Sequence, residues 1–172
     1  MKSNIDSAAF RQMMGCFATG VAVVTGCNDE LGPFGLTINS LTSVSLDPPL
    51  ILFCLDKDAA LYKHFLCVET FAINFLSHGQ EEISRHFASR HHHAKPKSLW
   101  DKSQQDCPIL RGTLGWMVCR THAKHKGGDH TIFVGETTSL YKRAGTQEPL
   151  IYFHGRYRDL KAAGKVTSGA RK

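Results

Sequence analysis

The sequence lacks the residue spacings of a disulfide framework or a zinc site. Its six cysteines are widely separated, with no CxxC pair and no close set of cysteine and histidine ligands. The positions are Cys16, Cys27, Cys54, Cys67, Cys107 and Cys119. We therefore expect reduced and mostly packed thiols.

Long apolar runs are also missing. The N-terminus begins MKSN without the apolar segment of a signal peptide. No run approaches the ~18 apolar residues of a membrane span. The sequence therefore predicts a reducing, cytoplasmic location.

Glycine-rich phosphate-binding motifs are absent as well. Neither GxGxxG nor the P-loop pattern occurs, so a bound nucleotide would be held in another way. We also find no internal repeat and no low-complexity segment. These absences argue against the common nucleotide-binding folds.

Length and composition indicate one globular domain. A chain of 172 residues with 42% hydrophobic and 21% charged residues suits a single domain, which we place at residues 1–160. Residues 161–172 are expected to form a basic, flexible tail. The net charge of +6 would suit nucleic acid, a membrane surface or a phosphorylated small molecule, and it favours none of them.

Apolar periodicity predicts roughly six or seven strands and two or three short helices. The expected helices are residues 5–17, 59–68 and 80–88. The expected strands are residues 21–25, 35–38, 50–55, 71–76, 114–122, 131–141 and 150–157. Residues 89–106 are expected to be irregular. This order favours an antiparallel barrel or sandwich and excludes a Rossmann fold.

Residues 35–57, GLTINSLTSVSLDPPLILFCLDK, combine a dense polar run with an apolar one. A buried hydroxyl or amide without a hydrogen bond costs about 1 to 3 kcal/mol, so these polar side chains need water or another partner. The flanking runs resemble strands that enter a core. Composition favours a surface loop, whereas the flanks favour a ligand cradle, and the residues alone leave both open.

Residues 90–97, RHHHAKPK, contain three successive histidines. Adjacent histidines point in different directions, and no carboxylate or cysteine is spaced to complete a ligand set. We therefore predict a solvated basic loop and no metal. Its charge could attract a nicotinamide dinucleotide or favour a 2′-phosphate.

Five motifs occur together in order along the chain. They are FATGV (17–21), the stretch at 35–57, EISRHFA (82–88), GGDH (127–130) and HGRY (154–157). The set resembles the short-chain flavin reductase family, from residue 10 to about 157. This resemblance implies an FMN-binding split barrel, which is an antiparallel Greek-key β-barrel with a few short helices. It also implies electron transfer from NAD(P)H to a flavin.

The resemblance further implies which residues bind the flavin. A wall of backbone amides and small polar side chains suits the edge of an isoalloxazine ring. The implied wall consists of Gly35, Leu36, Thr37, Asn39 and Ser40, continued by Ser43, Val44 and Ser45. Asp56 and Lys57 are implied at the flavin phosphate, with Lys57 as the charge partner.

Further positions follow from the same resemblance. Residues 84–87 are similar to a family segment near that phosphate or the adenine of FAD, where His86 and Phe87 are the implied contacts. Packing against the core is the alternative for Ser84 and Phe87. His130 is implied as the catalytic residue that orients the nicotinamide, rather than as a nucleophile. Tyr157, with Arg156 as a second candidate, is implied beside the nicotinamide pocket.

The expected function is therefore an NAD(P)H:flavin oxidoreductase that supplies reduced FMN or FAD to a separate monooxygenase. The resemblance also implies a homodimer. An oxidase or corrinoid-type reductase on the same barrel is one alternative. A non-enzymatic flavin or nucleic-acid binding module is another, and the lack of aromatic residues within a basic patch argues against it. The choice between FMN and FAD, and between NADH and NADPH, stays open.

Overall fold

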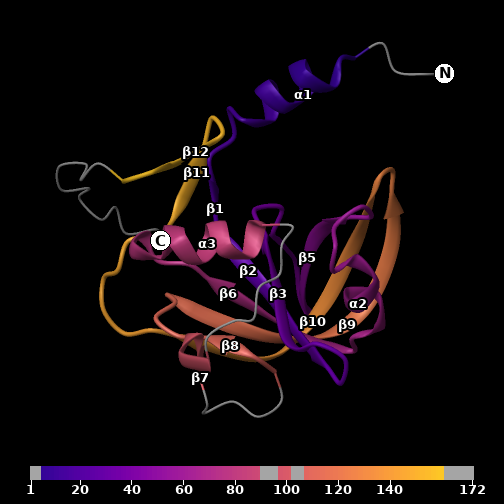
Figure 1. Ribbon diagram of the computed structural model, residues 1–172, viewed down its shortest axis with the longest axis vertical. Coiled ribbons are helices and arrows are strands. Elements are labelled where there is room, and N and C mark those ends of the chain that lie inside the picture. Colours follow the sequence, from indigo (N-terminus) through magenta and orange to yellow (C-terminus); the bar gives the residue numbers. More distant parts are fainter. Residues whose placement is uncertain (1–4, 90–96, 102–106, 161–172) are drawn as a thin grey trace.

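The largest part of the molecule is a seven-stranded antiparallel sheet with strand order β3-β2-β6-β9-β10-β5-β4 (Figure 1). The computed structural model describes residues 5–89, 97–101 and 107–160. The strands are β2 (Ala22–Asn28), β3 (Gly32–Ile38), β4 (Thr42–Leu46), β5 (Pro49–Asp56), β6 (Thr70–Phe75), β9 (Gly115–Gly127) and β10 (His130–Lys142). Within the described residues, neither β3 nor β4 pairs with a further strand, so the barrel is open between them. The predicted split barrel is confirmed.

Alternating side chains of the central strands fill the barrel interior. In β5, Ile51, Phe53 and Leu55 are buried whereas their neighbours are more exposed. The Phe53 ring stacks on Phe133 of β10, with ring centroids 5.1 Å apart, and meets Phe71 of β6 edge-on at 5.3 Å. This aromatic packing ties β5, β6 and β10 into one core.

A buried amide joins the barrel to the short two-stranded sheet β7 (Trp100–Asp101) and β8 (Ile109–Leu110). The Asn74 amide donates to Val23 O at 3.1 Å, and its carbonyl accepts from Leu110 N at 2.8 Å. Asn74 is fully buried. Its amide nitrogen and carbonyl oxygen therefore hold β8 against β2 and β6.

Three helices lie outside the sheet: α1 (Ser7–Met14), α2 (Tyr62–Cys67) and α3 (Glu81–Ala88). All three lie within the predicted helical ranges. The 3₁₀ turn η1 (His78–Gln80) leads into α3, which covers β2 and β3. α1 stands off the barrel beyond a small sheet of β1 (Thr19–Gly20), β11 (Ile151–Phe153) and β12 (Arg156–Arg158) (Figure 1).

Several sequence predictions were incomplete or wrong. The polar run at residues 42–46, for which a surface loop and a ligand cradle were both open, forms the edge strand β4. Residues 150–157 form a hairpin rather than one strand, because His154 (φ 49°) and Gly155 (φ 72°) turn the chain between β11 and β12. The expected irregular region contains the 3₁₀ turn η2 (Lys97–Leu99) and β7, while residues 90–96 and 102–106 lie outside the described part.

The cysteines are free thiols, but only some of them are packed. Cys107 and Cys119 are buried, whereas Cys16, Cys27 and Cys67 are exposed. The expectation of mostly packed thiols was therefore wrong for half of the set. Among the described residues, no helix is both long and apolar enough to cross a bilayer.

Candidate active site

Three predicted residues meet where β5 ends and the β9–β10 hairpin turns. Asp56 lies opposite His130 in the β5–β10 register. The Lys57 backbone N–H donates to Asp129 O at 3.0 Å, and the Lys57 ammonium donates to Gly128 O. The hairpin can turn tightly here because Gly128 adopts a positive φ of 67°. The fold therefore places the predicted phosphate partner and the predicted catalytic histidine at one rim.

An adjacent carboxylate orients the imidazole of His130. His130 Nδ1 lies 2.8 Å from Asp129 Oδ1. The hydrogen bond with His130, and then the nearby imidazole charge, lower the pKa of Asp129. An ionised carboxylate can only accept, so Nδ1 carries the proton and Nε2 is the nitrogen left for a ligand. The sequence interpretation missed Asp129, although the GGDH motif contains it.

Ser40 is bound to the backbone of β5. Its hydroxyl donates to Cys54 O at 3.1 Å and accepts from Cys54 N at 3.0 Å. β4 pairs with β5 only as far as Thr42 opposite Leu52. The Ser40 side chain thus continues the edge pairing just before β4 begins, and it fixes the loop that carries Asn39.

A chain of hydroxyl groups links β3, α3 and β12. The Thr37 hydroxyl donates to Ser84 O at 2.7 Å, and the Ser84 hydroxyl lies 2.8 Å from the Tyr157 hydroxyl. The Arg85 guanidinium lies over the Tyr157 ring at 5.0 Å. Two predicted residues, Thr37 and Tyr157, are therefore brought together through Ser84, for which the sequence left a ligand segment or a core-facing helix open.

One predicted contact residue, Phe87, belongs to the core, and Gly35 packs against it. The Phe87 side chain is fully buried and packs among the apolar residues of β2 and β8. A β-carbon on Gly35 would lie 2.9 Å from Val24 O and 3.0 Å from the Phe87 ring. Gly35 therefore allows α3 to approach β3, and Phe87 offers no surface to a ligand. Leu36 also packs against the main core.

The remaining predicted residues lie at the surface or its margin. His86 is half-buried, with its ring edge-on to Phe87 at 5.3 Å. A β-bulge between Ser43 and Ser45 leaves Val44 exposed. The Ser45 hydroxyl donates to Asp47 O at 3.1 Å, so it is used within the β4–β5 turn.

A cavity of about 620 Å³ lies against the Asn39–Ser40 loop. Its other walls are the end of α1, Thr19 and the β11–β12 turn. Among the described residues, the buried Thr19 hydroxyl has no hydrogen-bond partner. A polar ligand in this cavity could satisfy such a group. Tyr157 lines a different cavity of about 470 Å³, together with Arg85 and Arg156.

The donor set fits a flavin mononucleotide or dinucleotide. Lys57 is exposed and supplies a cation for a phosphate, while Asn39 offers an exposed amide. Among the strands that the structure describes, β3 pairs only with β2, so its second edge has backbone groups that face the split of the barrel. These groups match the donors and acceptors along one edge of an isoalloxazine.

Comparison with known proteins gives a consistent result. The family described as flavin reductase like domain matches residues 14–161. A protein of Agrobacterium fabrum named FMN reductase (NADH) SmoA is 40% identical over 152 residues, covering 88% of this chain and 85% of its own. A Mycobacterium tuberculosis protein named flavin-dependent monooxygenase, reductase subunit HsaB, is 31% identical over 162 residues, covering 94% of this chain and 86% of its own.

A solved structure resembles the whole fold. The Streptomyces globisporus C-1027 NADH:FAD oxidoreductase SgcE6, solved in complex with NAD and FAD fragments, superposes with a TM-score of 0.82 at 36% identity. The match covers 93% of this chain and 96% of that chain. Fold and sequence thus point to the same group of proteins.

Proposed function

This chain belongs to the flavin reductase like domain family, and on that premise we propose that it is an NAD(P)H:flavin oxidoreductase. Hydride leaves C4 of the reduced nicotinamide and joins N5 of FMN or FAD. The nicotinamide is thereby oxidised by two electrons, and the flavin is reduced by two. The flavin supplies the electron-accepting ring, and the protein supplies binding and orientation.

We assign the flavin ring to the open side of the barrel beside the Asn39–Ser40 loop. Thr37 and Asn39 supply polar contacts, while Ser40 and Gly35 shape the wall from behind. Lys57, with Asp56 beside it, lies at the phosphate end. His86 and Tyr157 border the site from α3 and β12. The support for this assignment is the cavity along the loop and the exposed cation of Lys57.

His130 positions the nicotinamide in this proposal. Asp129 holds Nδ1–H, and Nε2 faces the ligand as an acceptor, or as a donor when the ring is protonated. The reaction needs close contact between two rings and no protein nucleophile, so orientation is the main contribution of the side chain. The observation that carries the proposal is the joint position of Lys57 and His130 at the end of β5.

The reduced flavin is proposed to pass to a separate monooxygenase component. The relative named as a monooxygenase reductase subunit supports this role. We also propose a homodimer, because the exposed apolar side chains of α1 and of the end of β10 leave a surface that a second copy could cover.

Steady-state oxidation of NADH and NADPH by the purified protein, with and without added FMN or FAD, tests the proposed activity. We expect oxidation that depends on added flavin and a preference for one flavin and one dinucleotide. A protein that oxidises neither dinucleotide would contradict the proposal. Tight flavin binding with turnover only when an organic substrate is added would instead favour an oxidase or reductase of a bound small molecule.

A further inference from the structure

The apolar stripe of α1 is not buried against any part of the chain that the structure describes. Phe10, Met13 and Met14 have the i, i+3, i+4 spacing of one helical face, and Phe17 extends it. Their exposed fractions are 57% for Phe10, 70% for Met13 and 53% for Met14. No residue of α1 is buried. An amphipathic helix of this length gains most of its stability from packing, so this face calls for a partner.

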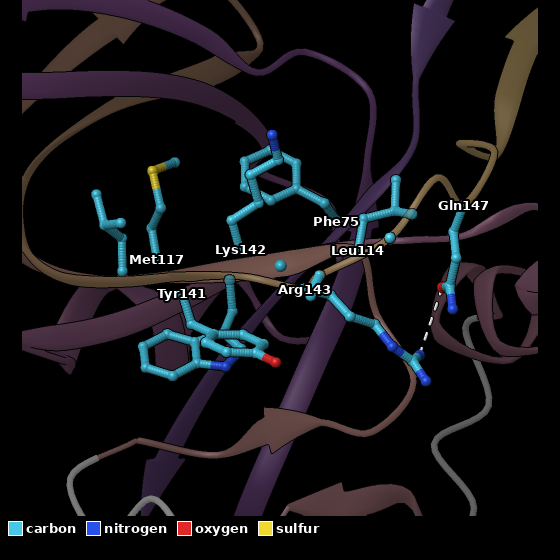
Figure 2. Close-up of a pocket in the computed structure, with 12 residues that line it drawn as sticks. Phe75, Leu114, Met117, Tyr141, Lys142, Arg143 and Gln147 are labelled. Carbon is cyan, nitrogen blue, oxygen red and sulfur yellow. Dashed lines mark hydrogen bonds between the residues drawn. The ribbon is translucent and has the colours of Figure 1, made fainter.

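The barrel carries an unfilled apolar groove where β9 begins and β10 ends. Figure 2 shows Phe75, Leu114, Met117 and Tyr141 around it. Trp116 stacks on Tyr141 with ring centroids 5.8 Å apart and an interplanar angle of 27°. The groove has a volume of about 410 Å³, and it includes Leu140, which is 67% exposed. Its lining contains none of the residues assigned to the flavin.

α1 does not reach this groove in its own chain. It projects beyond the β11–β12 hairpin, away from the start of β9 and the end of β10 (Figure 1). Four further segments of the sequence could in principle fill the groove: residues 1–4, 90–96, 102–106 and 161–172. Their large apolar residues are only Met1 and Val166. These segments therefore lack the chemistry to fill an apolar groove.

Charge separates the candidate occupants further. The rim of the groove carries Lys142 and Arg143. The tail at 161–172 carries four basic residues and no acidic one, so the rim would repel it. In residues 5–17 the charges of Asp6 and Arg11 cancel. Residues 5–17, which contain α1, are thus the candidate occupant of the groove that is both apolar and electrically neutral.

We propose that α1 of one copy packs into the groove of a second copy, and that the second copy does the same in return. The two contacts are then equivalent, as a two-fold symmetric dimer requires. This inference rests on the proposed homodimer and names the surfaces that form it. In such a dimer the apolar stripe of α1 and the apolar groove bury each other.

The packing of α1 against a second copy also affects a wall of the proposed flavin site. Met14 and Phe17 line the cavity that contains Asn39 and Ser40. A neighbouring cavity of about 360 Å³ shares Phe17 and Asn39 with it, and shares Phe75 and Leu114 with the groove. Anchoring α1 in the partner therefore fixes one wall of the flavin cavity, and flavin affinity is expected to fall when the dimer dissociates.

Two charge variants of the full-length protein test the exchange by sedimentation velocity. Phe10→Asp disables the helix, and Leu140→Asp disables the groove. Each substitution acts twice in a symmetric dimer, and each lost apolar contact weakens association about tenfold, so we expect dimerisation to be weaker by about 100-fold. Both side chains are exposed, so circular dichroism should be unchanged.

Gln12→Asp is the matched control, because it adds the same charge on the opposite side of α1 and should stay dimeric. Mixing the two variants is the decisive step. The Leu140→Asp chain keeps a good helix and the Phe10→Asp chain keeps a good groove, so one contact forms again and the mixture should associate more tightly than either variant alone.

Several results would overturn the exchange: a monomeric wild type, a dimer that survives either variant, or a mixture that does not associate. Flavin reduction by the wild type in the same preparations separates these outcomes from a failure of the proposed activity. An active monomer would reject the exchange and leave the reductase proposal standing.

Discussion

Replacing Ser40 by alanine is expected to loosen the wall of the proposed flavin site from behind. The substitution removes both hydrogen bonds between the Ser40 hydroxyl and the Cys54 backbone, at 3.1 and 3.0 Å. Each such bond contributes about 0.5 to 1.5 kcal/mol net, so the free energy of unfolding should fall by about 1 to 3 kcal/mol. The Asn39 loop then loses its attachment to β5.

Urea denaturation and flavin titration, on the same preparations, measure the two effects separately. Flavin affinity should fall by about tenfold if about 1.4 kcal/mol of the lost stabilisation of the Asn39 loop is needed to bind the flavin. Ser40→Thr is the control, since it keeps the hydroxyl. An unchanged free energy of unfolding in Ser40→Ala would refute this reasoning. A fall in affinity alone would mean that Ser40 contacts the flavin directly.

Three further predictions concern the core and the rim of the site. Asn74→Ala leaves buried backbone groups of Val23 and Leu110 without partners, so urea denaturation should show a loss of about 2 to 4 kcal/mol, and a loss below that range would contradict the network. Burial raises the pKa of Cys119 from 9.0 to about 11. A raised pKa adds stability that is present below pH 9 and is lost as the pH rises through about 11. Between these limits the free energy of unfolding of the wild type should therefore fall by about 2 to 3 kcal/mol more than that of Cys119→Ala. Equal pH slopes would exclude a buried neutral thiol. Asp129→Asn should raise the KM for NADH by less than about fivefold, because the pair is exposed, with kcat and flavin affinity little changed; a large fall in kcat would contradict a positioning role.

Much of the barrel could be predicted because its strands are patterned by burial. β5 alternates around Ile51, Phe53 and Leu55, and that pattern is visible in the sequence. β4 was missed because TSVSL is mostly polar and its two apolar residues, Val44 and Leu46, are exposed, so that its structure depends on pairing with β5. The β11–β12 turn was missed although His154 and Gly155 are a recognisable turn pair.

The candidate site could be predicted only in part. The resemblance indicated His130 and Lys57, but it could not reveal that Thr37 and Tyr157 meet through Ser84, because those residues are far apart in the chain. Gly35 and Phe87 were assigned to the ligand, and their packing against each other was visible only in the fold. The stripe of α1 predicts a buried face, yet that face is exposed in this chain, and we propose that a second copy covers it.

Anaerobic mixing of the protein and its preferred flavin with a reduced nicotinamide tests the central claim most directly. We predict that the oxidised flavin absorbance is lost as the nicotinamide is oxidised, in equal amounts. Deuterium at the transferred C4 position should slow this loss if hydride transfer limits the rate. A flavin that stays oxidised under these conditions would contradict the proposed activity.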